Sequence, residues 1–302
     1  MNILIVGTGG VGGYFGGLLA KAGEDVSFLA RGKHGQAIRK NGLHVKSIDG
    51  DFQVKVNVFE KPPKGKIFHL ILICVKAYQT EQVLPVIQSC IHKETTLISL
   101  QNGIGRHEIL RAQFPKAHVL GGHCNVGSFV EEPGVIRHVA GGAVVIGEIS
   151  GTTSPIIDEI QKRFQKAGMD IAVSKDIVLS QWQKLMWNLG FNGPTAILDM
   201  NVGEILKRDE QRTLIRSLIH EGMEVAKANQ FLLPQDLAEK MMARSEKYLA
   251  AVETSMARDR RLGRPLELDI FYQFIMEEGR RHQIPTPANA LVYRILSAFQ
   301  IS

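Results

Sequence analysis

The feature that most constrains the fold is a glycine cluster near the start of the chain, 7-GTGGVG-12. A short apolar run, Asn2–Val6, precedes it, and a helical pattern of apolar residues follows over 11–22. In this strand–loop–helix context one glycine makes a tight turn, a second lets the backbone approach a pyrophosphate, and a third allows the helix to pack closely on the strand. The glycines at these three positions are Gly7, Gly9 and Gly12. The cluster therefore predicts a dinucleotide-binding site, against the alternative of a glycine-rich turn that binds nothing.

The rest of the first half continues this alternation of strands and helices. The strand-like runs are Asp25–Ala30, His69–Val75 and Thr95–Leu100, and a helical pattern covers Glu81–Cys90. Such alternation predicts a parallel sheet covered by helices on both faces. Past about residue 174 the strand patterns end and amphipathic helices follow one another. We therefore predict an α/β Rossmann-like domain over residues 1–174 and an all-α domain over residues 175–302.

Two further segments predict antiparallel hairpins. In the first, Asp49-Gly50-Asp51 supplies the turn. In the second, the runs Val135–Val139 and Ala143–Gly147 flank Ala140-Gly141-Gly142, which we expect to form the turn. Near the end of the chain, Thr286-Pro287 is expected to open the last helix.

Composition favours a soluble cytoplasmic protein over a membrane or secreted one. Of the 302 residues, 44% are hydrophobic and 22% are charged, and no apolar run approaches the roughly 20 residues that span a bilayer. The start of the chain, MNILIVGTGG, lacks the basic segment and the long apolar run of a signal peptide. The three cysteines have no metal-binding spacing and the histidines form no paired-ligand motif, so we expect no bound metal.

The positive charge of the chain is concentrated in its first half. Residues 175–302 hold 17 Lys and Arg against 16 Asp and Glu, so nearly all of the net charge of +6 lies in residues 1–174. This distribution suits a small anionic ligand. We expect no nucleic acid partner, because no basic stripe is interleaved with aromatic residues, and the arginines within 258–264 are typical of a solvated helix end.

Arg31 bears on the choice of dinucleotide. NAD-binding domains usually place an acidic residue at the end of the second strand, where it holds the ribose hydroxyls. Here that strand ends at Ala30, and Arg31 follows it. A guanidinium can clamp a phosphate with two hydrogen bonds and can stack on an adenine. The residue favours NADP(H) over NAD(H), the alternative being an arginine in a solvated loop.

Polar residues also follow the next two core strands. Lys76 comes directly after the run that ends at Val75, and Asn102 comes shortly after the run that ends at Leu100. Ligands of open parallel sheets bind outside the carboxyl ends of the strands. We therefore expect both side chains to contact the cofactor or the substrate.

A polar stripe lies on a helix of the second half, 181-QWQKLMWNLGFNGPTAIL-198. Lys184, Asn188 and Asn192 are four residues apart, so they share one face of the helix. A solvated face is one interpretation. However, Asn is a poor helix former, no glutamate lies near the lysine, and large apolar residues surround the stripe. An amine beside two amides in such surroundings can bind and protonate a small molecule.

Together these residues resemble those of the ketopantoate reductases (2-dehydropantoate 2-reductases), NADPH enzymes of pantothenate synthesis. The resemblance covers nearly the whole chain. It is carried by 7-GTGGVG-12, Arg31, 75-VK-76, 101-QNG-103 and the Lys184 stripe, and by the blocks 255-SMARDRRLGRPLELD-269 and 285-PTPANALVY-293. It implies a Rossmann-like domain followed by a helical domain of the 6-phosphogluconate dehydrogenase C-terminal-like fold. That helical domain could pair with a copy of itself to form a homodimer.

The resemblance also implies roles for individual residues. Lys184 would be the catalytic lysine, and Glu267 would act with it at the reacting centre or on the cofactor side. The substrate would be bound by Asn102, Lys184, Asn188, Asn192 and Ser255. The cofactor would be held by Gly7, Thr8, Gly9, Gly10, Val11, Gly12, Arg31, Lys76, Asn102 and Glu267. In one departure, Val202 and not an asparagine precedes Gly203-Glu204, so a contact that some members make there stays open.

These residue types suit the reduction of a 2-oxo acid. Hydride from NADPH would attack the keto carbon, and a lysine ammonium could stabilise and then protonate the carbonyl oxygen. The expected function is the reduction of 2-dehydropantoate to (R)-pantoate in pantothenate and coenzyme A biosynthesis. Two alternatives stay open, a reductase of another branched 2-oxo acid and a non-catalytic NADP-sensing protein. An intact Lys184 counts against the sensor, which has no use for a proton donor.

Overall fold

The structure of the protein, a computed structural model, describes residues 1–63 and 65–300. It forms two compact units, Met1–Val178 and Leu179–Ser302. They divide inside a long helix, four residues after the boundary that the sequence suggested at 174/175. The first unit contains the sheet, and the described part of the second is built of helices and loops.

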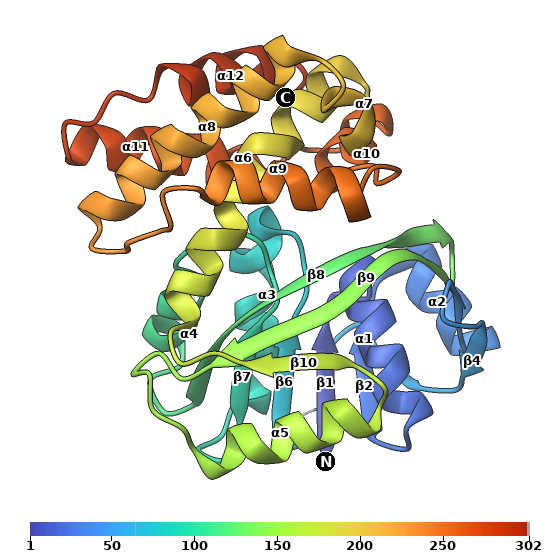
Figure 1. Cartoon of the computed structure of the whole chain (residues 1–302). Coiled ribbons are helices and arrows are strands. Elements are labelled where there is room, and N and C mark those ends of the chain that lie inside the picture. The colour runs from blue at the N-terminus through green and yellow to red at the C-terminus, as the bar shows by residue number, and fades with distance from the viewer. Residues whose placement is uncertain (64, 301–302) are drawn as a thin grey trace. The chain divides into compact units, whose positions relative to one another are not determined.

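A single sheet organises the first unit (Figure 1). Its strands β8-β7-β6-β1-β2-β5, in that order, run parallel, which confirms the predicted parallel sheet. β9 pairs antiparallel with β8, and β3, β4 and β10 extend the sheet beyond β9. The strands are β1 (Asn2–Val6), β2 (Asp25–Leu29), β3 (Leu43–Ser47), β4 (Phe52–Val54), β5 (Asn57–Phe59), β6 (Leu70–Ile73), β7 (Thr96–Ser99), β8 (His118–Glu132), β9 (Val135–Gly147) and β10 (Asp170–Val173).

Helices cover both faces of the parallel strands because successive residues of a strand point to opposite sides and both sides are apolar. In β1, Ile3 and Ile5 belong to one buried core, while Leu4 and Val6 belong to another. The first core includes residues of α1 and α5, and the second includes residues of α3 and α4 (Figure 1). The helical elements of this unit are α1 (Gly10–Lys21), α2 (Gly32–Asn41), η1 (Ala77–Gln79), α3 (Thr80–Ile87), η2 (Gln88–Cys90), α4 (Arg106–Gln113) and α5 (Pro155–Lys166).

One of the two predicted hairpins is correct and the other is wrong. β3 and β4 pair antiparallel around the turn at Asp49-Gly50-Asp51, as expected. The two runs that flank Ala140-Gly141-Gly142, however, form one strand, β9, which pairs with β8 through the turn Pro133-Gly134. Gly141 and Gly142 have φ angles of 69° and 127°, and the register of the two strands shifts beside them. These glycines therefore make an irregularity within a strand instead of a turn.

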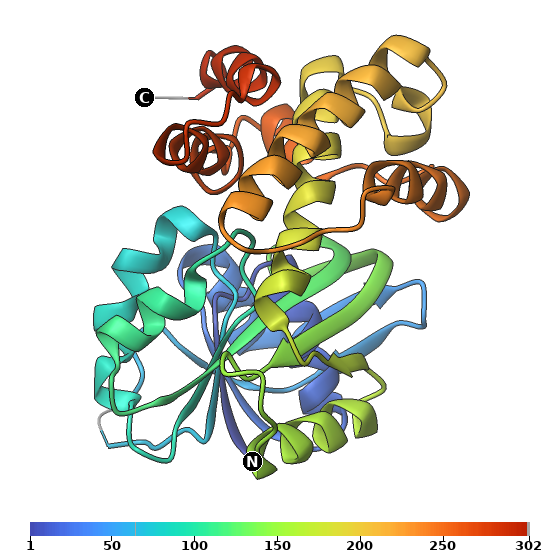
Figure 2. The same ribbon diagram turned by 60° about the vertical axis from the view of Figure 1, so that its left-hand side comes forward.

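The second unit is helical, as predicted (Figure 2). Its first helix, α6 (Ile177–Leu198), packs closely against α8 (Asp209–Ala228), where a Cβ atom on Gly222 would lie 2.7 Å from the Leu189 side chain. The other elements are α7 (Val202–Ile205), α9 (Leu237–Tyr248), α10 (Ser255–Arg261), the π-helix η3 (Asp269–Gln273), α11 (Phe274–Arg281) and α12 (Pro287–Ser297). Proline is therefore at the start of the last helix, as the sequence indicated.

Within residues 1–63 and 65–300, no helix is both long and apolar enough to cross a membrane.

Candidate active site

The glycine cluster forms a tight loop between β1 and α1 with one open position. Gly7 has a φ of 96°, and a Cβ atom there would lie 2.6 Å from the Val75 side chain. A Cβ atom on Gly12 would lie 2.1 Å from the Gly7 carbonyl oxygen, and one on Gly10 would lie 2.1 Å from that of Ser128. At Gly9, in contrast, a Cβ atom would meet no heavy atom within 4 Å. Only the glycine assigned to backbone approach of a pyrophosphate thus has free space beside it, so the loop fits a dinucleotide.

A histidine that the sequence did not single out for a role lies beside this loop. The His34 Nδ1 atom on α2 accepts a hydrogen bond of 3.0 Å from the Gly134 amide, and the same ring faces the backbone of Thr8. Burial lowers the pKa of His34, which favours the neutral imidazole that accepts this bond. The ring therefore connects α2 to the turn between β8 and β9. Because its partners are distant in sequence, no local pattern could have revealed this contact.

Arg31 lies where the sequence analysis placed it, just past the carboxyl end of β2. β2 is the parallel neighbour of β1, with Leu29 paired to Val6, so the segment after β2 starts beside the glycine loop. Arg31 precedes α2 as its N-cap residue, and its side chain is exposed. A guanidinium at this position is available to a cofactor phosphate.

Lys76 and Asn102 follow two neighbouring parallel strands, β6 and β7. Gln101 ties the two segments together: its side-chain nitrogen donates to the Val75 carbonyl at 3.0 Å and to the Thr80 hydroxyl at 2.8 Å. Its side-chain oxygen accepts from the Ser99 hydroxyl at 3.0 Å, and Gln101 itself is buried. Gln101 thereby fixes the spacing of the two segments. In the sequence, Gln101 stood out only as part of 101-QNG-103.

In the second unit, the polar stripe of α6 is largely removed from water. Asn188 is 5% exposed and Asn192 is 1% exposed, and the Asn192 side-chain nitrogen donates to the Asn188 side-chain oxygen at 3.3 Å. The interpretation of the stripe as a solvated face is therefore wrong for both asparagines. Lys184 is half-buried one turn earlier. Trp187, on the same helix, donates through its indole nitrogen to the Ser245 hydroxyl and stacks on Phe191.

Two further candidates of this unit lie on other elements. Ser255 is the first residue of α10 and is exposed, while the N-cap residue Thr254 accepts a hydrogen bond from the Ala257 amide. Glu267 precedes η3 and is 5% exposed, although most glutamates are solvated. A buried carboxylate requires polar partners, which agrees with a role at a site.

Comparison with known proteins now identifies the family. The family model described as ketopantoate reductase PanE/ApbA matches residues 3–151, and the model of its C-terminal part matches residues 176–300. The chain belongs to the ketopantoate reductase PanE/ApbA family. As a member, it is an oxidoreductase.

Individual relatives of this ketopantoate reductase family agree with the assignment. A 2-dehydropantoate 2-reductase of Nostoc is 31% identical over 88% of the chain and 84% of its own length. The crystal structure of a 2-dehydropantoate 2-reductase from Geobacter metallireducens has a TM-score of 0.92, with 32% identity over 99% of both chains. A D-mandelate dehydrogenase, solved with NADH and anilino(oxo)acetate, has the same fold, with a TM-score of 0.92 and 24% identity over 99% of this chain and 98% of its own.

The residues predicted for the ketopantoate reductase site fall into two groups, one in each unit. The first unit brings the glycine loop, Arg31, Lys76 and Asn102 to the carboxyl ends of its parallel strands. In the second unit Asn188 and Asn192 touch. Asn201, the residue before Val202, exchanges hydrogen bonds of 2.8 Å with Glu204 in a capping box at the start of α7. Among residues 1–63 and 65–300, no group of three or more His, Cys, Asp or Glu side chains could hold a metal ion.

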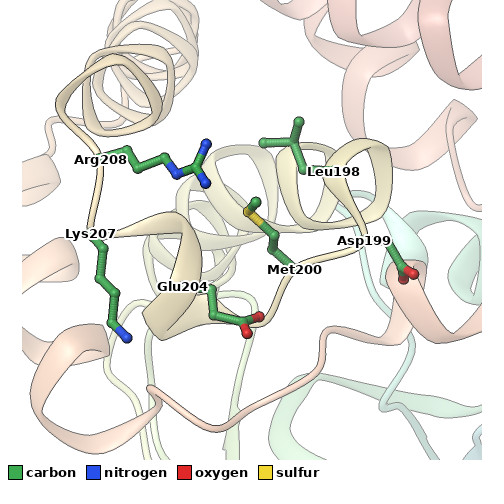
Figure 3. A pocket seen from close by; sticks show the side chains of 6 residues that line it. All are labelled: Leu198, Asp199, Met200, Glu204, Lys207 and Arg208. Atoms are coloured by element: carbon green, nitrogen blue, oxygen red, sulfur yellow. The ribbon is translucent and has the colours of Figure 1, made fainter.

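An open pocket of about 390 Å³ lies elsewhere in the second unit, at the end of α6 (Figure 3). Its lining residues are Leu198, Asp199, Met200, Glu204, Lys207 and Arg208. None of the predicted site residues lines it, and its charged side chains are exposed. Asp199 follows the last residue of α6 and has a φ of 53°, and its carboxylate accepts a hydrogen bond from the Arg261 guanidinium at 2.9 Å. The pocket offers side chains of both charges but no buried acid or base for the reaction.

Proposed function

We propose that the protein reduces 2-dehydropantoate to (R)-pantoate with NADPH, a reaction of pantothenate and coenzyme A biosynthesis. The observation that carries the proposal is the stripe Lys184, Asn188 and Asn192, whose two amides are buried and joined side chain to side chain. Structural asparagines of a helix interior are costly, because Asn competes with the backbone for hydrogen bonds. A buried pair beside a lysine is therefore best explained by a small polar ligand.

The residues of this chain would divide the chemistry as follows. When bound, NADPH supplies a hydride to the keto carbon. The Lys184 ammonium stabilises the negative charge that develops on the carbonyl oxygen and then donates a proton to it from Nζ. The amides of Asn188 and Asn192 bind and orient the substrate's carboxylate and hydroxyl. Ser255 would donate a hydrogen bond to the substrate and Glu267 would accept one. These two residues complete the binding residues of the second unit.

The cofactor would be held by the first unit. The open space beside Gly9 leaves room for a pyrophosphate, and the start of α1 favours negative charge there. Arg31 would bind the 2′-phosphate of the adenosine ribose, which gives the preference for NADPH. Lys76 and Asn102, tied together through Gln101, would contact the nicotinamide ribose and the substrate.

The experiment that tests the function is a turnover assay. Loss of NADPH absorbance would be followed with 2-dehydropantoate, in parallel with pyruvate, 2-oxoisovalerate and 2-oxoisocaproate. Rapid turnover of 2-dehydropantoate alone is the expected result. Tight binding of NADPH with no turnover of any of these four oxo acids would contradict the proposal. It would favour the alternative of a non-catalytic NADP-sensing protein.

A second candidate is a reductase of another 2-oxo acid with the same residues. The D-mandelate dehydrogenase that shares this fold is named for a different hydroxy acid. The fold by itself therefore does not select the substrate. Preference for one of the other three oxo acids in the assay would favour this candidate and keep the mechanism.

Replacing Arg31 by Asp tests the cofactor preference. The change removes a charge-assisted phosphate contact worth about 1.5–3 kcal/mol, and adds a carboxylate that repels the phosphate. We expect the Kd of NADPH to rise by at least about tenfold and that of NADH to change much less. Both constants can be measured by titration of cofactor fluorescence.

The matched control is Lys40→Asp, which makes the same change of charge at the other, exposed end of α2. It should leave both dissociation constants nearly unchanged. An equal loss of NADPH and NADH affinity in Arg31→Asp would show that Arg31 does not bind the 2′-phosphate.

The cytoplasmic location and the homodimer stay predictions. Light scattering of the purified protein measures whether it is a dimer.

A further inference from the structure

A proline interrupts α6 next to the predicted substrate-binding residues. Pro194 has no backbone N–H, so the Gly190 carbonyl loses its usual hydrogen-bond donor in the helix. Prolines in helices are a common cause of kinks. The turn from Asn188 to Asn192 lies directly before this point, so whatever fixes the helix here also fixes those two side chains.

A buried tyrosine fixes this turn. The Tyr272 hydroxyl accepts a hydrogen bond of 2.7 Å from the Gly193 amide and donates one of 3.0 Å to the Leu189 carbonyl. These are the two groups that an α-helix pairs with each other, four residues apart. Tyr272 is fully buried, and burial raises the pKa of its hydroxyl, so the proton that it donates to Leu189 stays in place.

The sequence of α6 makes room for this hydroxyl. A Cβ atom on Gly193 would lie 2.3 Å from the Tyr272 hydroxyl oxygen and 2.5 Å from Val292. Any other residue at this position would expel the phenol from the helix. The glycine and the tyrosine are therefore parts of one arrangement.

The bridge connects two groups of predicted site residues. On α6, Leu189 follows Asn188 and Gly193 follows Asn192. Tyr272 lies in η3, the π-helix that begins shortly after Glu267. π-helical turns are rare and often occur at functional sites. One hydroxyl thus couples the asparagines of α6 to the segment that carries the buried glutamate.

A second hydroxyl pair ties the same turn to the element that carries Ser255. The Thr254 hydroxyl accepts from the Ala257 amide and forms a hydrogen bond of 2.8 Å with the Thr195 hydroxyl. Thr195 in turn donates to the Phe191 carbonyl at 2.6 Å. Both threonines are buried.

We propose that Tyr272 is a positioning residue of the reductase. Its hydroxyl holds the interrupted turn of α6 so that Asn188 and Asn192 meet the substrate together with the Glu267 segment. The proposal rests on the proposed function, since it assigns the substrate to this stripe. Tyr272 touches neither substrate nor cofactor in this scheme; it acts through the helix.

The test is Tyr272→Phe, with Tyr293→Phe as the matched control. The control also removes a tyrosine hydroxyl, but one that is half-buried and makes only a 3.4 Å contact to Gln273. We expect Tyr272→Phe to raise the KM for the oxo acid by about tenfold, the scale of one weakened substrate hydrogen bond, while kcat and the Kd of NADPH change less than about threefold. Hydrogen exchange of the Gly193 amide should also become faster. Tyr293→Phe should change none of these quantities.

The possible outcomes separate this inference from the function on which it rests. If the wild-type protein turns over an oxo acid and Tyr272→Phe leaves its KM unchanged, the positioning role is overturned and the function stands. If KM and the Kd of NADPH worsen together, Tyr272 is a general structural residue and the proposal is also overturned. A wild-type protein that reduces no 2-oxo acid overturns both. Should Tyr272→Phe not fold, Thr195→Val applies the same measurements to the same turn.

Discussion

Replacing Lys184 by Ala is expected to lower kcat by a factor on the order of 10² to 10⁴, the usual contribution of a general acid. The substitution removes the ammonium that stabilises and protonates the developing oxyanion. Lys184 is half-buried beside Asn188, a buried amide that supplies neither charge nor an acidic proton. No neighbour on the stripe can therefore take over the role, and the loss should appear mainly in kcat.

The Kd of NADPH decides whether this role is correct. The residues predicted to hold the cofactor phosphates belong to the first unit, so Lys184→Ala should bind NADPH as the wild-type protein does. Lys207→Ala is the control, because it removes an exposed lysine of the same unit that lies outside the stripe, and kcat should not change. Loss of NADPH binding together with turnover in Lys184→Ala would contradict an assignment as general acid.

The periodicity of apolar residues was sufficient to predict most of the fold. Strands such as β6 are apolar on both faces, and helices such as α3 follow them, which leaves few alternatives to a parallel sheet. The pattern failed at Gly141-Gly142, where two glycines are typical of a turn and also of an irregular strand. Long-range pairing with β8 decided between these two structures, and pairing partners are not encoded locally.

The sequence suggested candidate site residues but not the residues that hold them in place. Spacing alone placed Lys184, Asn188 and Asn192 on one face, because helical geometry fixes that relation. It could not show that the two asparagines are buried, since burial depends on what packs against the helix. Likewise Gln101 and Tyr272 act through partners distant in the chain, which only the folded structure brings together.

The glycine loop allows binding and folding to be separated by two single substitutions. Gly9→Ala should abolish most dinucleotide binding and leave the stability of the free protein nearly unchanged. The Gly9 backbone, with φ of −75° and ψ of −163°, is allowed for alanine, and a Cβ atom would meet no heavy atom within 4 Å. The added methyl group would instead occupy the space of the pyrophosphate. Each lost charge-assisted hydrogen bond is worth about 1.5–3 kcal/mol, so we expect the Kd of NADPH to rise by roughly 10- to 100-fold or more.

Gly12→Ala is the matched substitution, and it should lower the stability of the free protein. Its Cβ atom would lie 2.1 Å from the Gly7 carbonyl oxygen, a backbone atom that cannot rotate away. Overpacking of this kind costs about 1–3 kcal/mol or more, so the Tm of the free protein should fall by several degrees. Thermal melts of the free proteins therefore separate the two variants if Gly9 faces the cofactor, because Gly9→Ala should lose NADPH affinity without the fall in Tm that Gly12→Ala shows. A Gly9→Ala protein that binds NADPH like the wild type would mean that the pyrophosphate does not approach this loop, and the dinucleotide assignment would have to be moved away from it.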